Sequence, residues 1–330
     1  MKKILILAGG RGSEREVSIA SGKRVAEALC RLGVMAALVD PSQEFADGGE
    51  PFSCDLNELK RKSPLFYAVQ SESKGSAYLT ESVLKLCKRA DAVFICLHGG
   101  IGENGRLQAV LETFGIKYFG SSPEASALAM DKLTSKRIFE SVGIPTPLYT
   151  VYRKGERSSP VPPRYPCVVK PIGEGSSVGV SAVRTPIELM GAIESAFKCT
   201  DTVIMEAMIR GREVTVGVLN GTPLAVTEII PKGGFYDYES KYTVGKTVEI
   251  TPAEISESLT RRAMRLALRT HKALGLENFS RVDMIIEKGT ELIYVLEANT
   301  IPGMTATSLL PLAAEYRGID LSGLCERMMR

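Results

Sequence analysis

Short apolar runs alternate with segments of helical spacing along the first third of the chain. Residues 3–7 (KILIL) are apolar, a glycine-rich turn follows, and residues 14–32 place apolar side chains at helical intervals. The same pattern predicts a buried strand at 92–97 and a helix at 105–114. Because strands alternate with helices, we expect a parallel sheet in a first α/β domain over residues 1–120.

The middle of the chain, residues 121–210, mixes helices with strands. A helix is predicted at 123–142, since Gly143 and Pro145 follow it and end its apolar spacing. Apolar runs predict three strands and a further helix, at residues 148–152, 167–171 and 203–208 and at residues 186–197. The polar and irregular segment 41–74 of the first domain predicts no element.

The last segment, residues 211–330, is richer in strands. The dipeptide Asn220-Gly221 is a strong hairpin signal between the predicted strands 213–219 and 222–230. Residues 255–274 form a long amphipathic helical pattern. A second hairpin is predicted to pair residues 281–287 with residues 291–299.

Composition excludes several classes of protein. The chain has 330 residues, 44% of them hydrophobic and 24% charged, with a net charge of +3, as in ordinary globular proteins. No run of Lys and Arg concentrates charge, which argues against a nucleic-acid partner. No apolar run approaches the roughly 20 residues that span a membrane. The opening MKKILILAGG is too short in its apolar part for a signal peptide and favours a buried first strand.

The seven cysteines are odd in number and include no C-x-x-C pair. This pattern favours reduced, mostly buried thiols over disulfides or a zinc site. We therefore expect a cytoplasmic protein.

The second hairpin carries a candidate metal site. If it turns about Thr290, Asp283 lies opposite Glu297, and residues two apart in a strand share a face. Arg281 and Asn299 would then project from the same side. Clustered oxygen ligands suit Mg²⁺. A solvated strand face with a single ion pair is the alternative.

A glycine-rich stretch follows the predicted strand that ends near Lys170. In VVKPIGEGSSVGV (168–180), glycines would let backbone N–H groups approach an anion, and the lysine would add a charge. The order of a Walker A motif is absent. The stretch therefore indicates either phosphate binding or an ordinary surface loop.

Three further polar residues are Glu14 and His98, each with two interpretations, and His271, with one. Glu14 lies near the start of a predicted helix, where it would cap the helix or serve a site. His98 ends a predicted buried strand, where α/β proteins bind ligands, but a core histidine is the commoner case. His271 has no evident partner and is expected on the surface. The GGRGSERE segment does not match the G-x-G-x-x-G dinucleotide fingerprint.

Taken together, the motifs resemble those of the D-alanine–D-alanine ligases of the ATP-grasp superfamily. The matching stretches run in the family's order: GGRGSEREVS (9–18), LHGGIGENG (97–105), MDKLTSK (130–136), VVKPIGEGSSVGV (168–180), FYDYESKY (235–242), RVDM (281–284) and EANTIPGMT (297–305). One departure is Asn104, where the family usually has Asp, at a position that looks structural.

The resemblance implies an α/β ATP-grasp fold with α+β elements. Residues 1–120 would be a Rossmann-like parallel-sheet domain that binds substrate. Residues 121–210 and 211–330 would be the two ATP-grasp subdomains, with ATP held between them. The last would carry the metal-binding hairpin and a lid loop, 232–244, which is expected to be mobile without nucleotide and to close over the site. A homodimer is also implied.

The resemblance further implies roles for the nucleotide and metal ligands. ATP phosphates, adenine and ribose would be bound by a set of residues from both subdomains: Lys132, Lys170 and Lys241 at the phosphates, Glu206 and the backbone of Ile209 at adenine, and Glu213 at the ribose. Asp283, Glu297 and Asn299 would hold Mg²⁺, expected as a pair of ions, with Mn²⁺ able to substitute.

The implied activity is ATP-dependent ligation of two D-alanines through D-alanyl phosphate, for peptidoglycan precursor synthesis. Substrate binding and catalysis are assigned to seven residues: Glu14 at the first ammonium, Arg281 and Gly303 at the oxyanion, Ser308 at the second carboxylate, His98 beside the substrate, and Ser176 with Tyr242 in a hydrogen-bonded triad with Glu14.

Rival interpretations remain at this point. A related ligase could use D-lactate or another amino acid as its acceptor. A nucleotide-binding regulatory domain would have lost the metal ligands or the lid lysine, and these residues are present. A nicotinamide dehydrogenase is disfavoured by the broken glycine pattern.

Overall fold

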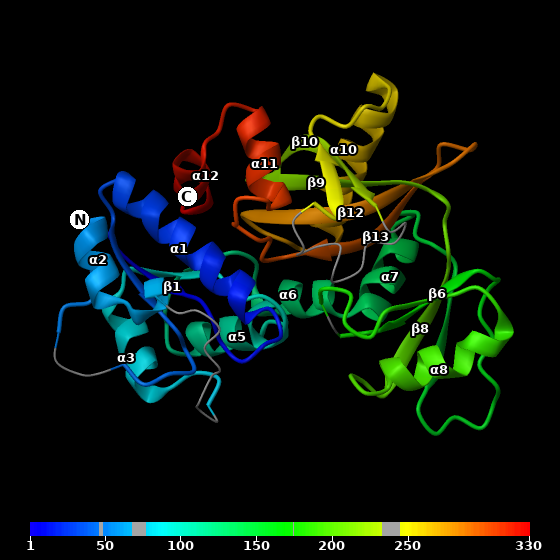
Figure 1. Ribbon diagram of the computed structural model, residues 1–330, viewed down its shortest axis with the longest axis horizontal. Coiled ribbons are helices and arrows are strands. Elements are labelled where there is room, and N and C mark those ends of the chain that lie inside the picture. Colours follow the sequence, from blue (N-terminus) through cyan, green and yellow to red (C-terminus); the bar gives the residue numbers. More distant parts are fainter. Residues whose placement is uncertain (46–48, 68–76, 174, 233–244) are drawn as a thin grey trace.

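Three β-sheets organise the computed structural model, which describes residues 1–45, 49–67, 77–173, 175–232 and 245–330 (Figure 1). The first is parallel, in the order β2-β1-β3-β4, as the alternating pattern predicted. Its strands are β1 (Lys3–Leu7), β2 (Met35–Val39), β3 (Ala92–Ile95) and β4 (Tyr118–Phe119).

Side chains alternate between the two faces of this first sheet. Ile4 and Ile6 belong to one core cluster, whereas Leu5 and Leu7 belong to another. Helices cover both faces: α1 (Arg15–Arg31) and α12 (Leu321–Met328) on the first, α3 (Glu81–Arg89) and α5 (Arg106–Thr113) on the second. Shorter helices in this part of the chain are α2 (Leu56–Lys62), the 3₁₀ turn Pro64–Tyr67 and α4 (Gly100–Glu103).

The last helices of the chain return to the first sheet. Figure 1 shows α12, in red, beside α1, in blue, and the two helices pack together. Leu324 and Met328 join the cluster that holds Ile4 and Ile6. Helix α11 (Leu309–Tyr316) reaches the same cluster through Leu310 and also contacts the third sheet. The start and end of the chain therefore share one core.

The second sheet is antiparallel, in the order β5-β8-β6-β7, with α8 packed against it. Its elements are β5 (Tyr149–Arg153), β6 (Cys167–Pro171), β7 (Ser181–Val183), α8 (Pro186–Ala196) and β8 (Thr202–Ala207). Strands β5, β6 and β8 and helix α8 agree with the predicted elements to within two residues at each end, whereas β7 was not predicted. Residues 154–166 connect β5 to β6 without regular structure.

The single helix predicted over 123–142 is wrong. Two helices occupy this segment, α6 (Pro123–Met130) and α7 (Lys132–Ser141). Asp131 lies between them in an extended conformation, and its side chain accepts a hydrogen bond from the Thr134 N–H, as an N-cap does. The backbone N–H of Lys132 donates to Ile172 O at 2.9 Å, outside the helix. A tertiary contact thus starts α7 anew.

The third sheet is antiparallel, in the order β11-β10-β9-β12-β13. Its strands are β9 (Gly211–Leu219), β10 (Thr222–Pro231), β11 (Thr247–Ile250), β12 (Phe279–Glu287) and β13 (Ile293–Asn299). Both predicted hairpins are present, and Asn220 and Gly221 have the positive φ angles, 47° and 72°, that a tight hairpin turn needs. Helix α10 (Glu257–Ala273) packs its apolar side on one face, and the other face carries polar residues.

His271 is buried, and its predicted surface position is therefore wrong. It lies on the side of α10 that faces the sheet, with 5% of its surface exposed. Its Nδ1 lies 2.8 Å from the Ser280 hydroxyl of β12, and burial lowers its pKa. A histidine on an amphipathic helix looks exposed until the facing strand supplies its hydrogen-bond partner.

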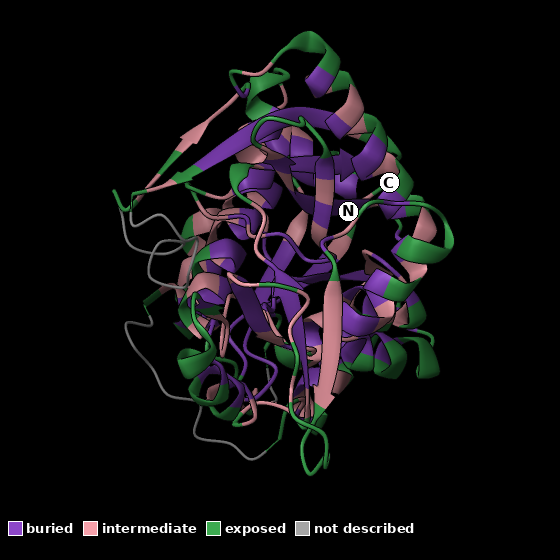
Figure 2. Ribbon diagram, turned by 90° about the vertical axis from the view of Figure 1, so that its right-hand side faces the viewer, coloured by how far each residue is buried: buried purple, intermediate pink, exposed green. Residues whose placement is uncertain are grey.

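Figure 2 shows the buried residues concentrated in the strands, with exposed ones on the outer helices and loops. All seven cysteines are free. Among the described residues, no helix is both long and apolar enough to cross a membrane. The boundaries predicted at residues 120 and 210 both fall between sheets.

Candidate functional site

The polar face of the third sheet centres on the hairpin β12–β13. Asp283 pairs with Glu297, as the sequence predicted, and Arg281 pairs with Asn299. Asp283 is buried and is surrounded by donors. Arg281 donates to both of its oxygens, from Nε at 2.9 Å and Nη2 at 2.8 Å. The Thr215 hydroxyl and the Asn299 amide add hydrogen bonds of 2.6 and 3.0 Å.

Glu297 lies partly exposed on the same face, and Lys132 of α7 approaches it to 3.1 Å. Lys132, expected at a nucleotide phosphate, thus lies next to a candidate metal ligand. The side-chain amide of Asn299 donates an N–H to Asp283, so the amide oxygen of Asn299 remains as an acceptor. Two carboxylates and an amide oxygen are the hard donors that Mg²⁺ prefers, so these residues fit the ion chemically.

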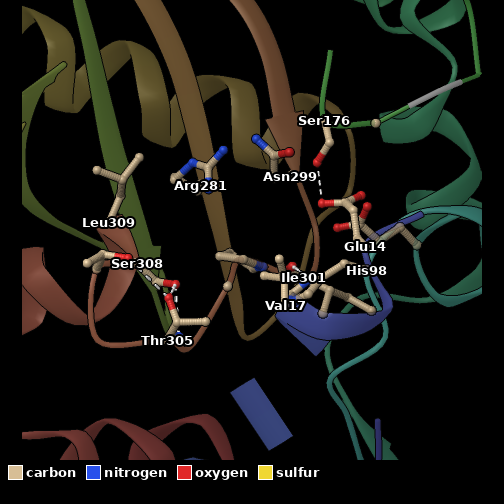
Figure 3. Close-up of a pocket in the computed structure, with 15 residues that line it drawn as sticks. Glu14, Val17, His98, Ser176, Arg281, Asn299, Ile301, Thr305, Ser308 and Leu309 are labelled. Carbon is tan, nitrogen blue, oxygen red and sulfur yellow. Dashed lines mark hydrogen bonds between the residues drawn. The ribbon is translucent and has the colours of Figure 1, made fainter. Parts of the chain in front are cut away.

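A small cavity of about 100 Å³ opens beside this hairpin. Three distant parts of the chain line it: the start of α1 with the end of the first sheet, the glycine-rich loop, and the hairpin with the segment after it (Figure 3). The lining includes Glu14, His98, Glu103, Ser176, Arg281, Asn299, Gly303 and Ser308. Predicted substrate and catalytic residues therefore meet in one place.

Glu14 and Ser176 join two of these parts. The Ser176 hydroxyl donates a hydrogen bond to the Glu14 carboxylate across 162 positions of sequence (Figure 3). Glu14 occupies the N-cap position of α1 but makes no side-chain cap bond, which excludes the simple capping role. Ser176 and Ser177 have φ angles of 48° and 60°, an unusual backbone conformation for residues other than glycine. Such strain is typical of functional loops.

His98 borders the cavity and is buried. Its Nδ1 lies 3.1 Å from the Ile301 carbonyl, which can only accept, so Nδ1 carries the proton. Its Nε2 lies 3.2 Å from the Ser21 hydroxyl oxygen. The same oxygen accepts a hydrogen bond from the Met304 N–H. Burial lowers the pKa of His98, and Glu14 nearby opposes this shift. The histidine therefore ties the first sheet to the segment after β13.

Glu103 also lines the cavity, although no role was predicted for it. It accepts the Gly99 N–H at 2.9 Å. Burial of its carboxyl, together with the nearby Glu14, raises the pKa of Glu103 to about 8. The signal that could have found it is the GENG turn directly after His98, at the carboxyl end of a parallel strand.

The far end of the cavity is built by the segment before α11. The Ser308 hydroxyl accepts the Thr305 N–H at 2.9 Å (Figure 3). A Cβ at Gly303 would lie 2.7 Å from the Ser308 Oγ, so any larger residue here would require the Ser308 side chain to move. The backbone of Gly303 consequently stays open to the cavity that it lines.

A larger cavity of about 560 Å³ lies between the second and third sheets. Residues predicted to bind nucleotide line it, namely Lys132, Lys170, Glu206, Ile209 and Glu213. Lys170 Nζ donates to Glu206 Oε2 at 2.9 Å, and Lys136 Nζ lies 3.1 Å from Oε1. Each oxygen of the buried Glu206 carboxylate is therefore paired with one lysine. Because a carboxylate has about four acceptor positions, Glu206 can still accept an N–H from a ligand in the cavity that it lines.

Two predicted site residues, Lys241 and Tyr242, lie outside the described residues, as does most of the proposed lid 232–244. Lys136 is a further residue at this site that the sequence analysis did not single out. It sits in the quoted MDKLTSK motif, one helical turn after Lys132.

Comparison with known families covers almost the whole chain. Residues 3–121 match the family described as "D-ala D-ala ligase N-terminus", and residues 138–330 match "D-ala D-ala ligase C-terminus". The D-alanine–D-alanine ligase of Syntrophotalea carbinolica is 40% identical over 329 residues, 99% of this chain and 95% of that protein. That of Geobacter sulfurreducens is 41% identical over 330 residues, covering 99% and 93%.

Comparison with solved structures leads to the same family. The D-alanine–D-alanine ligase of Bacillus anthracis complexed with ATP is 28% identical, with a TM-score of 0.78, covering 100% of this chain and 96% of that one. VanG, a D-Ala:D-Ser ligase of Enterococcus faecalis, is 30% identical with the same TM-score, covering 99% and 98%. These neighbours confirm the expected α/β ATP-grasp fold. The chain belongs to the D-alanine–D-alanine ligase family.

Proposed function

We propose that this chain uses ATP to join two D-alanines into D-alanyl-D-alanine, a precursor of peptidoglycan, through a D-alanyl phosphate intermediate. One observation carries this proposal. The hairpin β12–β13 belongs to both cavities, since Asp283 and Glu297 line the larger one while Arg281 and Asn299 line the smaller one. A phosphoryl group at this junction would lie between a nucleotide and an amino acid.

The larger cavity is proposed to hold ATP. The Glu206 carboxylate would accept the adenine amino group, the backbone of Ile209 would contact the adenine edge, and Glu213 would bind the ribose. Lys132 and Lys170 would lie along the phosphates, with Lys241 added from the lid. Lysines suit this role as mobile point charges.

Asp283, Glu297 and Asn299 are proposed to hold Mg²⁺, with Mn²⁺ as a substitute. Bound there, Mg²⁺ would neutralise charge on the phosphates during transfer. In the chain itself, Arg281 and Lys132 supply positive charge to the same carboxylates. Buried carboxylates are thus compensated before any ligand binds.

In the first step, a carboxylate oxygen of D-alanine attacks the γ-phosphorus and ADP leaves. The acyl phosphate that forms has a good leaving group, which the free carboxylate lacks. Glu14 is proposed to bind the ammonium group of this D-alanine, with Ser176 and Tyr242 completing a hydrogen-bonded triad. His98 borders this subsite and is proposed to contact the substrate.

In the second step, the amine of another D-alanine attacks the acyl carbon, phosphate leaves and the amine loses a proton. Arg281 and the backbone N–H of Gly303 are proposed to stabilise the oxyanion, since both line the cavity. Ser308 would bind the carboxylate of the second D-alanine. Because water would hydrolyse the acyl phosphate, the segment 232–244 is proposed to act as a lid.

Further proposals concern the setting of the enzyme. We infer a homodimer in the cytoplasm, with no nucleic-acid or membrane partner. Residues 1–120, 121–210 and 211–330 are proposed as its domains, because each range contains one of the three sheets.

Acceptor choice separates this proposal from its rivals. D-Serine is the acceptor that the name of the similar VanG ligase points to, and D-lactate is the ester-forming alternative. We propose D-alanine rather than D-lactate, because a neutral tyrosine at position 242 offers nothing extra to an anionic hydroxy acid, whereas a cationic residue would repel the incoming ammonium.

The test supplies ATP, Mg²⁺ and D-alanine, alone and with equal D-lactate or D-serine, and identifies products by mass spectrometry at neutral pH. D-Alanyl-D-alanine in large excess, with ADP and phosphate in equal amounts, is expected. L-Alanine alone should give no dipeptide. Predominant ester or D-alanyl-D-serine would refute the proposed acceptor, and absence of ADP formation would refute the proposed activity.

A further inference from the structure

Lys136 is a completely buried lysine, with 0% of its surface exposed. Its Nζ donates a 2.6 Å hydrogen bond to the Thr146 hydroxyl and lies 3.1 Å from Glu206 Oε1. The Tyr149 ring lies beneath it, with the ring centre 5.4 Å away. Burying an ammonium group is costly unless it is paired. A lysine held here by three neighbours therefore points to a role beyond packing.

Charge around Lys136 is unbalanced in a way that favours an ionised Glu206. Two lysines, Lys136 and Lys170, flank this one buried carboxylate. Burial alone would raise the pKa of Glu206, but the two lysines outweigh burial and lower it. Burial lowers the pKa of Lys136 itself, against the attraction of Glu206. The carboxylate therefore stays an acceptor, which is the form that a ligand amino group needs.

Helix α7 carries Lys136 and Lys132 four residues apart, so both project from one side of the helix. Lys132 reaches Glu297 at the proposed phosphate end of the large cavity, and Lys136 reaches Glu206 at the adenine end. The Thr146 hydroxyl, which accepts from Lys136, donates to Val295 O of β13 at 2.9 Å. One helical turn therefore connects the two ends of the proposed nucleotide site.

We propose that Lys136 is a positioning residue for the nucleotide base. It holds the Glu206 carboxylate in the wall of the large cavity through the ion pair to Oε1, and thereby sets the preference for a purine that carries a 6-amino group. Lys170 fixes only the other oxygen, Oε2. This inference rests on the proposed function, because it assumes that the large cavity binds ATP.

The experiment compares ATP with purine riboside triphosphate, which lacks only the 6-amino group, in the wild type and in Lys136→Met. A hydrogen bond to a charged acceptor makes the wild-type KM for the analogue roughly tenfold to a hundredfold higher than for ATP. In Lys136→Met, KM for ATP should rise while KM for the analogue changes little, so the preference falls to a few-fold. kcat at saturating ATP should change much less than KM.

Lys136→Met should fold, since it removes the excess positive charge and leaves the Lys170–Glu206 pair intact. Lys154→Met is the matched control, because Lys154 is an exposed lysine paired with Asp201 at 3.6 Å in the same part of the chain. It should keep the wild-type preference. Thr146→Val is a second variant that keeps both charges and deletes the hydroxyl that holds Lys136, and it should reduce the preference in the same direction.

Equal increases in KM for both nucleotides, or an unchanged preference in both folded variants, would overturn the proposal and make Lys136 a purely structural residue. An active wild type with no preference for ATP over the analogue would overturn it as well. A wild type that forms no ADP with D-alanine would instead refute the proposed function, so the two failures can be told apart.

Discussion

Asp283 and Glu297 face each other across the β12–β13 hairpin because a bulge lies between them and the turn. Met284 pairs with Val295, so Leu296 is an extra residue on β13. Leu296 and Glu297 consequently both line the large cavity, although they are consecutive in the strand. Without the bulge, one of them would point to the opposite face.

The first prediction concerns this pair. Glu297→Gln or Asp283→Asn should lower the rate of ADP formation by at least about a hundredfold at saturating Mg²⁺, since each removes a charged ligand from the proposed metal site. Steady-state assays over a Mg²⁺ titration measure the loss, and circular dichroism checks the fold. Glu291→Gln, at the exposed turn of the same hairpin, should behave as the wild type. Near wild-type turnover in either site variant would contradict the metal assignment.

The second prediction concerns Glu103, whose pKa is raised to about 8 by burial and by Glu14. The folded state therefore binds the Glu103 carboxyl proton more tightly than the unfolded state does. The stability that this proton gives the fold is full below pH 4.5 and is lost as the pH rises through about 8. Glu103→Gln keeps an acceptor for the Gly99 N–H. It should therefore match the wild type near pH 5 and exceed its stability at pH 8.5 by about 1–2 kcal/mol, a value reduced for the partial exposure of the side chain.

Urea denaturation at several pH values measures this difference. Glu315→Gln, an exposed glutamate on α11, is the control and should follow the wild-type pH profile. Parallel profiles for the wild type and Glu103→Gln would show that this carboxyl ionises normally.

The third prediction uses two glycines with opposite surroundings. A Cβ on Gly211 would lie 1.9 Å from Ile286 O, a backbone atom of the neighbouring strand that cannot move aside easily. Gly211→Ala should therefore destabilise the fold by about 3 kcal/mol, at the upper end of overpacking effects, and weaken ATP binding beside it. Gly191, in α8, has open space around its Cβ position. Gly191→Ala should stabilise the protein by about 0.5–1 kcal/mol through helix propensity. Thermal or urea unfolding measures both, and a loss of stability in Gly191→Ala or none in Gly211→Ala would refute the argument.

Local sequence patterns determined many of the strands and turns of this protein. The apolar runs predicted the parallel first sheet, the Asn220-Gly221 turn predicted its hairpin, and strand alternation placed Arg281 and Asp283 on one face of the second hairpin. These features depend on neighbours in sequence or on the twofold period of a strand, so the sequence alone contains them. The ordered motifs identified the family for the same reason.

Only the tertiary structure decided which distant groups meet. Ser176 reaches Glu14 across 162 positions, His271 is buried by Ser280, and α7 begins where Ile172 accepts the Lys132 N–H. No local pattern encodes a partner supplied by another sheet. The same holds for the pKa shifts of Glu103 and Lys136, because burial and neighbouring charges cause both shifts. Those surroundings exist only once the three sheets have packed around the site.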